Sequence, residues 1–157
     1  MLHLIRTNSE NPDFISLVKS LDEDLLIRDG KDHAFFSQFN KIDKIKYVVV
    51  AYLNNSPVGC GAIKEYEKGI GEIKRMFVSP EGRGKGIATF ILKELEEWAE
   101  ELGYKVCILE TGLDFKEAVG LYKKNNYTII PNYGQYKEVE TSICFEKILN
   151  LNIEEEK

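Results

Sequence analysis

The sequence predicts a single α/β domain built on a mixed, mostly antiparallel sheet of six to seven strands, with a central parallel pair and about four helices on both faces. A length of 157 residues suits one compact domain. Three strand-like segments in the first half are joined by tight turns, which favours antiparallel pairing. From the third of these strands onward the chain alternates strand, helix, strand and helix, and this order places a parallel pair at the centre of the sheet.

The first half is expected to contain two helices and four strands. Residues 2–6, "LHLIR", suit a short strand. In residues 11–26, Asn11 caps a helix and Pro12 occupies its first position. The apolar face of this helix consists of Phe14, Ile15, Leu17, Val18 and Leu21. Residues 33–42, "HAFFSQFNKI", indicate a shorter helical piece. Three strands follow, "KYVVVAYL", "VGCGAIKEY" and "GEIKRMFVSP", separated by the turns "NNSP" and "KGIG".

The second half begins with a long helix over residues 87–102, which Gly103 ends. Its apolar stripe is Ile87, Ile91, Leu92, Leu95, Trp98, Ala99 and Leu102. The apolar run "KVCILET" is typical of a strand covered on both faces, and "DFKEAVGLYKKNN" predicts a helix. The last strands, "YTII" and "ETSICFEKIL", are joined by the loop "PNYGQYKEV".

Composition narrows the class of protein. Residues 1–150 are expected to form the domain, and residues 151–157 an acidic, solvated tail. A formal net charge of -5 argues against a general nucleic-acid binder, so no nucleic-acid partner is expected. The chain shows no apolar run of about 18 residues and no signal peptide, so we expect a cytoplasmic protein with no membrane partner.

The cysteines and histidines form no metal-binding pattern. Cys60, Cys107 and Cys144 lie far apart in apolar, strand-like segments without a CxxC spacing, which indicates buried, reduced thiols. His3 and His33 are isolated. No metal site is therefore expected.

The stretch "VSPEGRGKGIATFIL" places three glycines and two cations directly before the long helix. It is not a P-loop, because Ser79 stands where the first glycine belongs and Gly86 follows Lys85. A dinucleotide fingerprint also fails, since its last glycine would fall on Ile87 or Thr89.

The same stretch nevertheless favours an anion site. Glycines let the backbone approach an anion, and a helix N-terminus carries partial positive charge. The alternative is a tight strand-to-helix turn with Arg83 and Lys85 solvated. Three glycines near a first helical turn cost up to about 1 kcal/mol each in helix propensity. A functional role explains that cost better.

The stretch "RMFVSPEGRGKGIATFIL" resembles the acyl-CoA binding motif of the GNAT superfamily of N-acetyltransferases, with Arg83, Gly86 and Ala88 at the family's positions. "LETG" and "EAVGLYKKNNY" resemble its second conserved region, and the resemblance runs from residue 48 to about 147. Two departures stand out: Thr111 replaces a frequent asparagine, and "NY" at residues 126–127 replaces a frequent Gly-Phe.

The resemblance implies a GNAT-like fold and acetyl-CoA as co-substrate. Backbone N–H groups of residues 83–88 would hold the CoA pyrophosphate, residues 76–78 would pair with the pantetheine arm, and Thr111 would contact the pantetheine or the acceptor. The implied cofactor-binding residues are Met76, Phe77, Val78, Arg83, Gly84, Lys85, Gly86, Ile87, Ala88 and Thr111.

The resemblance also suggests catalytic roles. Acetyl transfer to an amine needs a neutral nucleophile, stabilisation of the oxyanion and a proton for the thiolate. Glu72 resembles the position of a family base; the alternative is an exposed strand-edge carboxylate paired with Lys74 or Arg75. Tyr122 matches the tyrosine that protonates the thiolate; the alternative is a core tyrosine. A backbone N–H of residues 77–78 is the expected oxyanion donor.

The acceptor is the least determined part. Tyr133, Gln135 and Tyr136 are candidate walls of an acceptor pocket, with packing or a homodimer contact as the alternatives. The acidic residues 22–33 could attract a cationic amine or form a solvated face. The leading hypothesis is an N-acetyltransferase acting on a primary amine of a small molecule, amino acid or peptide. The alternatives are an inactive acyl-CoA-binding sensor or partner protein, and a nucleotide-phosphate module.

Overall fold

The computed structural model describes residues 1–29 and 44–149, which fall into two compact units. The first unit comprises Met1–Lys64 with Lys74–Leu95, and the second comprises Glu65–Ile73 with Glu96–Lys157. The helix expected at residues 33–42 and the tail expected at residues 151–157 lie outside the described residues.

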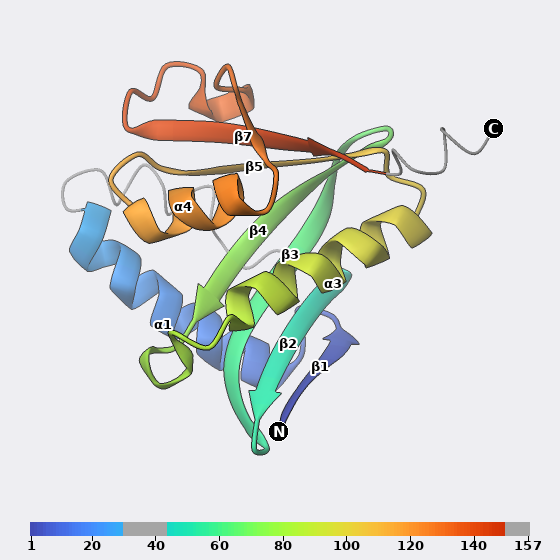
Figure 1. The fold of residues 1–157 in the computed structure, drawn as a ribbon, viewed down its shortest axis with the longest axis vertical. Coiled ribbons are helices and arrows are strands. Elements are labelled where there is room, and N and C mark those ends of the chain that lie inside the picture. The colour runs from blue at the N-terminus through green and yellow to red at the C-terminus, as the bar shows by residue number, and fades with distance from the viewer. Residues whose placement is uncertain (30–43, 150–157) are drawn as a thin grey trace. The chain divides into compact units, whose positions relative to one another are not determined.

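Seven strands are hydrogen-bonded in the order β1-β2-β3-β4-β5-β7-β6 (Figure 1). They are β1 (Leu2–Thr7), β2 (Tyr47–Leu53), β3 (Ser56–Glu67), β4 (Ile70–Val78), β5 (Val106–Gly112), β6 (Thr128–Ile130) and β7 (Ser142–Ile148). The pairs β1·β2, β2·β3, β5·β7 and β6·β7 are antiparallel, while β4·β5 is parallel. The mixed sheet with its central parallel pair is therefore confirmed.

The turns between the first strands have the left-handed backbone that hairpins need. Asn54 and Asn55 connect β2 to β3 with φ values of 50° and 70°. Gly69, at φ 82°, helps to connect β3 to β4. Asparagine and glycine adopt this conformation more readily than other residues, so the sequence itself favours direct hairpins here.

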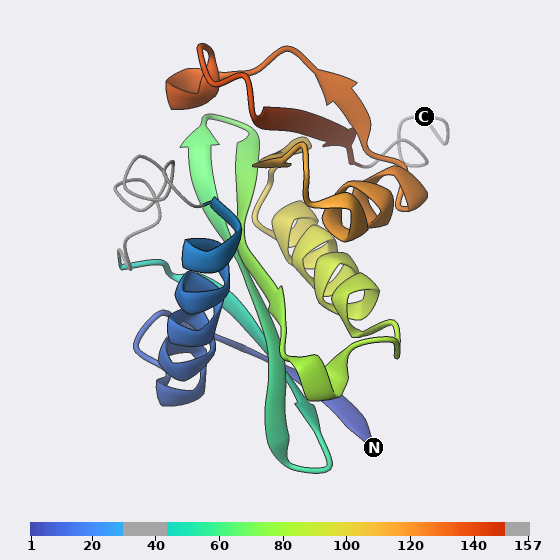
Figure 2. The ribbon, with the colours of Figure 1, turned by 90° about the vertical axis from the view of Figure 1, so that its left-hand side faces the viewer.

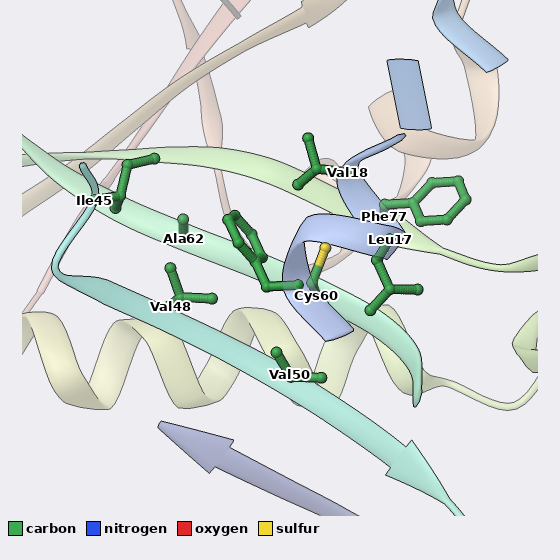
Figure 3. Close-up of a cluster of buried hydrophobic side chains, with 9 residues drawn as sticks. Leu17, Val18, Ile45, Val48, Val50, Cys60, Ala62 and Phe77 are labelled. Atoms are coloured by element: carbon green, nitrogen blue, oxygen red, sulfur yellow. The ribbon is translucent and has the colours of Figure 1, made fainter. Parts of the chain in front are cut away.

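Helix α1 (Pro12–Asp29) covers one face of the sheet in the first unit. Asn11 caps it, because its Oδ1 accepts hydrogen bonds from the N–H groups of Asp13 and Phe14 at 2.9 and 3.1 Å. Figure 3 shows the core that this helix forms with the strands. Its buried members are Phe14, Leu17, Val18, Ile45, Val48, Val50, Cys60, Ala62 and Phe77. Ile15, expected on the apolar face, is 43% exposed, because it lies about 100° around the helix from Phe14.

Within the first unit, residues 87–95 of helix α3 (Ile87–Glu101) cover the opposite face of the strands (Figure 2). Side chains alternate along β3, so Cys60 faces α1 while Gly61 faces α3. A Cβ at Gly61 would lie 2.8 Å from Leu95 Cδ1 and 2.9 Å from Ile91 Cγ2. The missing side chain thus lets this helix approach the sheet closely.

The second unit contains the parallel pair, the last strands and helix α4 (Lys116–Lys124). Residues Ile70–Glu72 of β4 pair with Val106–Ile108 of β5. Residues 1–29 and 44–149 thus contain three α-helices, against about four expected for the whole chain, together with the 3-10 turns η2 (Pro80–Gly82) and η3 (Gly134–Tyr136). None of these helices is long and apolar enough to cross a membrane.

The "NY" departure at the end of α4 has a structural explanation. Asn126 has φ 71°, the left-handed conformation that glycine usually takes after a helix, and the Tyr127 N–H donates to Tyr122 O at 3.0 Å. The Tyr127 hydroxyl donates to Glu96 Oε2 at 2.9 Å, and Lys147 Nζ donates to Glu96 Oε1 at 2.9 Å. The extra hydroxyl is therefore satisfied by a buried carboxylate.

The three cysteines are buried and free, as predicted. Burial raises the pKa of Cys60 and Cys107 to about 12, and that of Cys144 to about 11. These thiols remain protonated near neutral pH and are not nucleophiles.

Candidate functional site

The glycine-rich turn connects β4 to α3 in the first unit. Gly84 and Gly86 have φ values of 79° and 75°, and no heavy atom lies within 4 Å of a Cβ built at either position. Glycine is thus favoured at both positions by the left-handed backbone, and not because a larger side chain would clash with its surroundings. Gly82 differs, because a Cβ there would lie 3.1 Å from Val58 Cβ and from Val78 Cγ1.

Hydrogen bonds fix the turn to β3 and to the end of β4. The Ser79 N–H donates to Val58 O at 2.8 Å, and Arg83 Nε donates to Val78 O at 3.0 Å. Lys85 Nζ donates to Glu81 O at 3.1 Å. The two exposed cations are therefore not merely solvated, since Arg83 holds the last carbonyl of β4 and Lys85 holds a carbonyl of the turn.

The start of α3 offers the backbone donors that an anion needs. The hydrogen bond from the Phe90 N–H to Gly86 O, at 3.2 Å, begins the helical ladder. The N–H groups of Ile87, Ala88 and Thr89 precede it and have no acceptor within the helix. Two left-handed glycines followed by these donors fit a pyrophosphate.

The last residues of β4 offer backbone rather than side chains. Pairing with β5 covers Ile70–Glu72, and β4 continues to Val78. Phe77 is buried in the core against α1, and Met76 Sδ would lie 2.6 Å from a Cβ at Gly61. The polar groups of residues 76–78 are thus the part of this segment suited to an extended ligand.

Arg75 interrupts β4 with a backbone that the sequence did not predict. Its φ is 61°, an uncommon value for a residue with a side chain. Its buried guanidinium forms an ion pair with Asp22 at 3.5 Å between Nη1 and Oδ1, and Cys60 Sγ donates to Arg75 O at 3.4 Å. No sequence signal identifies a left-handed arginine.

In the second unit, Glu72 is 8% exposed and accepts a hydrogen bond from the Tyr133 hydroxyl at 2.6 Å. The alternative of an exposed strand-edge carboxylate is therefore wrong. Burial, followed by the charge of Glu72, raises the pKa of Tyr133 above its ordinary value, so this tyrosine remains a donor.

The loop between β6 and β7 is packed through its tyrosines. The Tyr133 ring contacts Tyr66 and Tyr136 edge-on, with centroid distances of 5.1 and 5.8 Å. Tyr136 is 3% exposed, so it is a core residue rather than a surface aromatic available to a second copy.

Tyr122 is buried on α4, as expected for its apolar face. Its ring centroid lies 5.8 Å from those of Tyr127 and Phe145. Burial raises its pKa above the ordinary value, and the charge of Glu110 adds to the effect. Glu110, which accepts a hydrogen bond from Ser142 Oγ at 2.6 Å, was not singled out from the sequence. The sequence feature that could have identified Glu110 is a carboxylate near the end of an otherwise apolar strand.

The predicted residues thus fall into two sets. Residues 76–78 and 83–88 belong to the first unit, and Glu72, Thr111, Tyr122, Tyr133 and Tyr136 belong to the second. Within the described parts of the chain, no three His, Cys, Asp or Glu side chains gather where they could hold a metal ion.

A mixed sheet with one parallel pair, together with a glycine-rich turn that leads from β4 into α3, defines an α/β protein whose turn has a backbone suited to an anion. The acetyltransferase (GNAT) family matches residues 11–127, and the chain belongs to this family. It is accordingly an acetyltransferase.

Individual relatives agree with this assignment. The IAA acetyltransferase of Azospirillum brasilense is 37% identical over 102 residues, which are 64% of this chain and 67% of that protein. YsnE of Bacillus subtilis, an uncharacterized N-acetyltransferase, is 35% identical over 101 residues, which are 63% of this chain and 67% of that protein. The fold is similar to that of a Klebsiella pneumoniae protein assigned as an acyl-CoA N-acyltransferase, with TM-score 0.80, 25% identity and coverage of 96% and 99% of the two chains. The PaiA N-acetyltransferase of Thermoplasma acidophilum, solved with coenzyme A, has TM-score 0.69 at 17% identity and coverage of 94% and 99%.

Proposed function

We propose that the chain transfers an acetyl group directly from acetyl-CoA to a primary amine of a small molecule, amino acid or peptide. The observation that carries this proposal is the turn of residues 83–88, where two left-handed glycines precede the open N-terminus of a 15-residue helix. Its backbone N–H groups would hold the pyrophosphate of acetyl-CoA.

The remaining donor contacts follow from β4 and β5. The backbone of residues 76–78 would bind the pantetheine arm as an added strand, since β4 extends beyond its paired segment with β5. Thr111 would hydrogen-bond the pantetheine or the acceptor from the end of β5.

The reaction forms a C–N bond and breaks the thioester C–S bond. Deprotonating a lysine-like amine costs roughly 4.6 kcal/mol at pH 7, whereas an α-amine costs roughly 1.4 kcal/mol, so a base matters most for the first class. Glu72 would take the proton of the ammonium, directly or through water. A backbone N–H of residues 77–78 would stabilise the oxyanion. Tyr122 would donate its proton to the CoA thiolate and regain one, directly or through water, from the nitrogen as the amide forms. Burial raises the pKa of Tyr122, so the hydroxyl is protonated before transfer.

The acceptor is best identified by measuring CoA thiol release with polyamines, amino acids, aminoglycosides and peptides. IAA belongs in this panel, because the Azospirillum brasilense relative is named for it. We expect release with at least one amine class. Tight acetyl-CoA binding without thiol release in the presence of any acceptor would favour the inactive sensor instead. If ATP competes for the site as effectively as CoA does, the nucleotide-phosphate module is favoured.

A further inference from the structure

The hydrogen bond between Tyr133 and Glu72 connects two distant parts of the chain. The residues are 61 positions apart, and the 2.6 Å distance between the hydroxyl and Oε2 is at the short end for such bonds. Glu72 is buried, so the bond is made in surroundings where a hydrogen bond to a carboxylate is stronger than in water.

The loop around Tyr133 is built so that its ring has little freedom. Tyr66 and Tyr136 contact the ring edge-on. Gly134 has φ 53°, and a Cβ there would lie 3.3 Å from the Tyr66 hydroxyl oxygen, so this position favours glycine. Asn132 Nδ2 donates to Val139 O and Ser142 O at 3.1 and 3.2 Å, which closes the loop on itself.

A fixed donor on one carboxylate oxygen restricts rotation of the whole carboxylate. A general base must be held within hydrogen-bond reach of the proton that it removes, and small displacements of a catalytic group lower the rate considerably. The Tyr133 hydroxyl is thus placed to determine where the second oxygen of Glu72 lies.

We propose that Tyr133 is a positioning residue that orients the Glu72 carboxylate for removal of the acceptor's proton. This inference rests on the proposed function, in which Glu72 is the base. It replaces the expected role of Tyr133 as a wall of the acceptor pocket with a role exerted through Glu72.

The test compares the full-length wild type with Tyr133→Phe, Glu72→Gln and the double variant, using the best acceptor of the panel. Glu72→Gln should lower kcat about 10²-fold or more, as expected for a lost general base. Tyr133→Phe should lower kcat about 10-fold with the acceptor KM within about twofold, because one hydrogen bond to a charged group is lost. In the Glu72→Gln background, the same substitution should have no further effect.

A matched control is Tyr127→Phe. Like Tyr133→Phe, it removes a hydrogen bond from a tyrosine to a buried glutamate, here at 2.9 Å, but Glu96 has no proposed role in the reaction. Its kcat should stay within about twofold of the wild type, as expected where only packing and stability are affected.

The outcomes separate the two proposals. If kcat falls in Glu72→Gln but is normal in Tyr133→Phe, the role of Tyr133 alone is overturned. The same holds if both variants lower kcat and the two losses multiply in the double variant. A normal Glu72→Gln variant overturns the base and the positioning role together. If no acceptor supports turnover, the urea unfolding midpoints of the same four proteins test the hydrogen bond from Tyr133 to Glu72. Stability losses that are not additive in the double variant support this bond, and additive losses overturn it.

Discussion

Replacing Gly86 with alanine tests whether the left-handed backbone of the turn is what binds CoA. Gly86 has φ 75°, and no heavy atom lies within 4 Å of the added Cβ. The methyl group therefore meets no steric obstacle, and the whole cost is conformational. For an L-residue, that cost is about 1–2 kcal/mol.

The cost must appear in one of two measurements. If the turn keeps its conformation, the free energy of unfolding falls by this amount, and Tm falls by about 2–8 °C for a chain of this length. If the turn relaxes to an ordinary backbone, CoA must restore it, and Kd for CoA rises about 5–30-fold. Calorimetric titration with CoA and thermal unfolding, done on the same preparations, measure both quantities.

Gly120→Ala is the matched control. Gly120 also has no heavy atom within 4 Å of its Cβ, but it lies inside α4 and lacks a positive φ. Alanine there should leave CoA affinity unchanged and stabilise the helix by up to about 1 kcal/mol. If Gly86→Ala leaves both Tm and Kd at their wild-type values, the left-handed turn is not needed for CoA binding and our reasoning fails.

Three further predictions concern buried groups. Tyr122→Phe should lower kcat about 10²-fold with CoA affinity nearly unchanged; unchanged steady-state turnover would remove Tyr122 from the mechanism. Tyr127→Phe should lower the free energy of unfolding in urea by about 1.5–3 kcal/mol, because Glu96 loses a buried donor; an unchanged midpoint would show that this bond adds no stability. Burial raises the pKa of Cys107 from 9.0 to about 12. Above pH 9 this thiol ionises in the unfolded chain but not in the folded protein, so the free energy of unfolding falls as pH rises. This thiol alone should lower the free energy of unfolding by about 1 kcal/mol at pH 10, and a Cys107→Ala variant with the same alkaline slope as the wild type would contradict it.

The arrangement of elements was predictable because the deciding signals are local. Asn11 and Pro12 mark the start of α1, and apolar periodicity marks α3. Ile15 shows the limit of these signals, because it is exposed. Apolar periodicity predicts which face of a helix is buried, but it does not predict which residues at the border of that face remain exposed. The left-handed φ of Arg75 depends on how β4 packs, so composition could not reveal it.

In the candidate site, too, local features could be predicted from the sequence and long-range contacts could not. The glycine-rich turn is contiguous in sequence, so its glycines and cations could be recognised together. The bond from Tyr133 to Glu72 and the bond from Ser142 to Glu110 span 61 and 32 positions, and both depend on the path of the chain between β6 and β7. A loop path is set by packing, and a single sequence shows only which tyrosines are available to it.

The departure at residues 126–127 is best understood as one coupled change rather than two. Asn126 has φ 71°, a left-handed backbone that glycine adopts most readily and that asparagine adopts at a modest conformational cost. Tyr127 adds a hydroxyl to a buried position, which would destabilise the protein if that hydroxyl had no partner. Glu96 provides the acceptor from α3, and a buried carboxylate in turn requires the compensation that Lys147 gives it. Tyr127→Phe without a change at Glu96 should therefore destabilise this chain, because the buried carboxylate would lose its tyrosine donor.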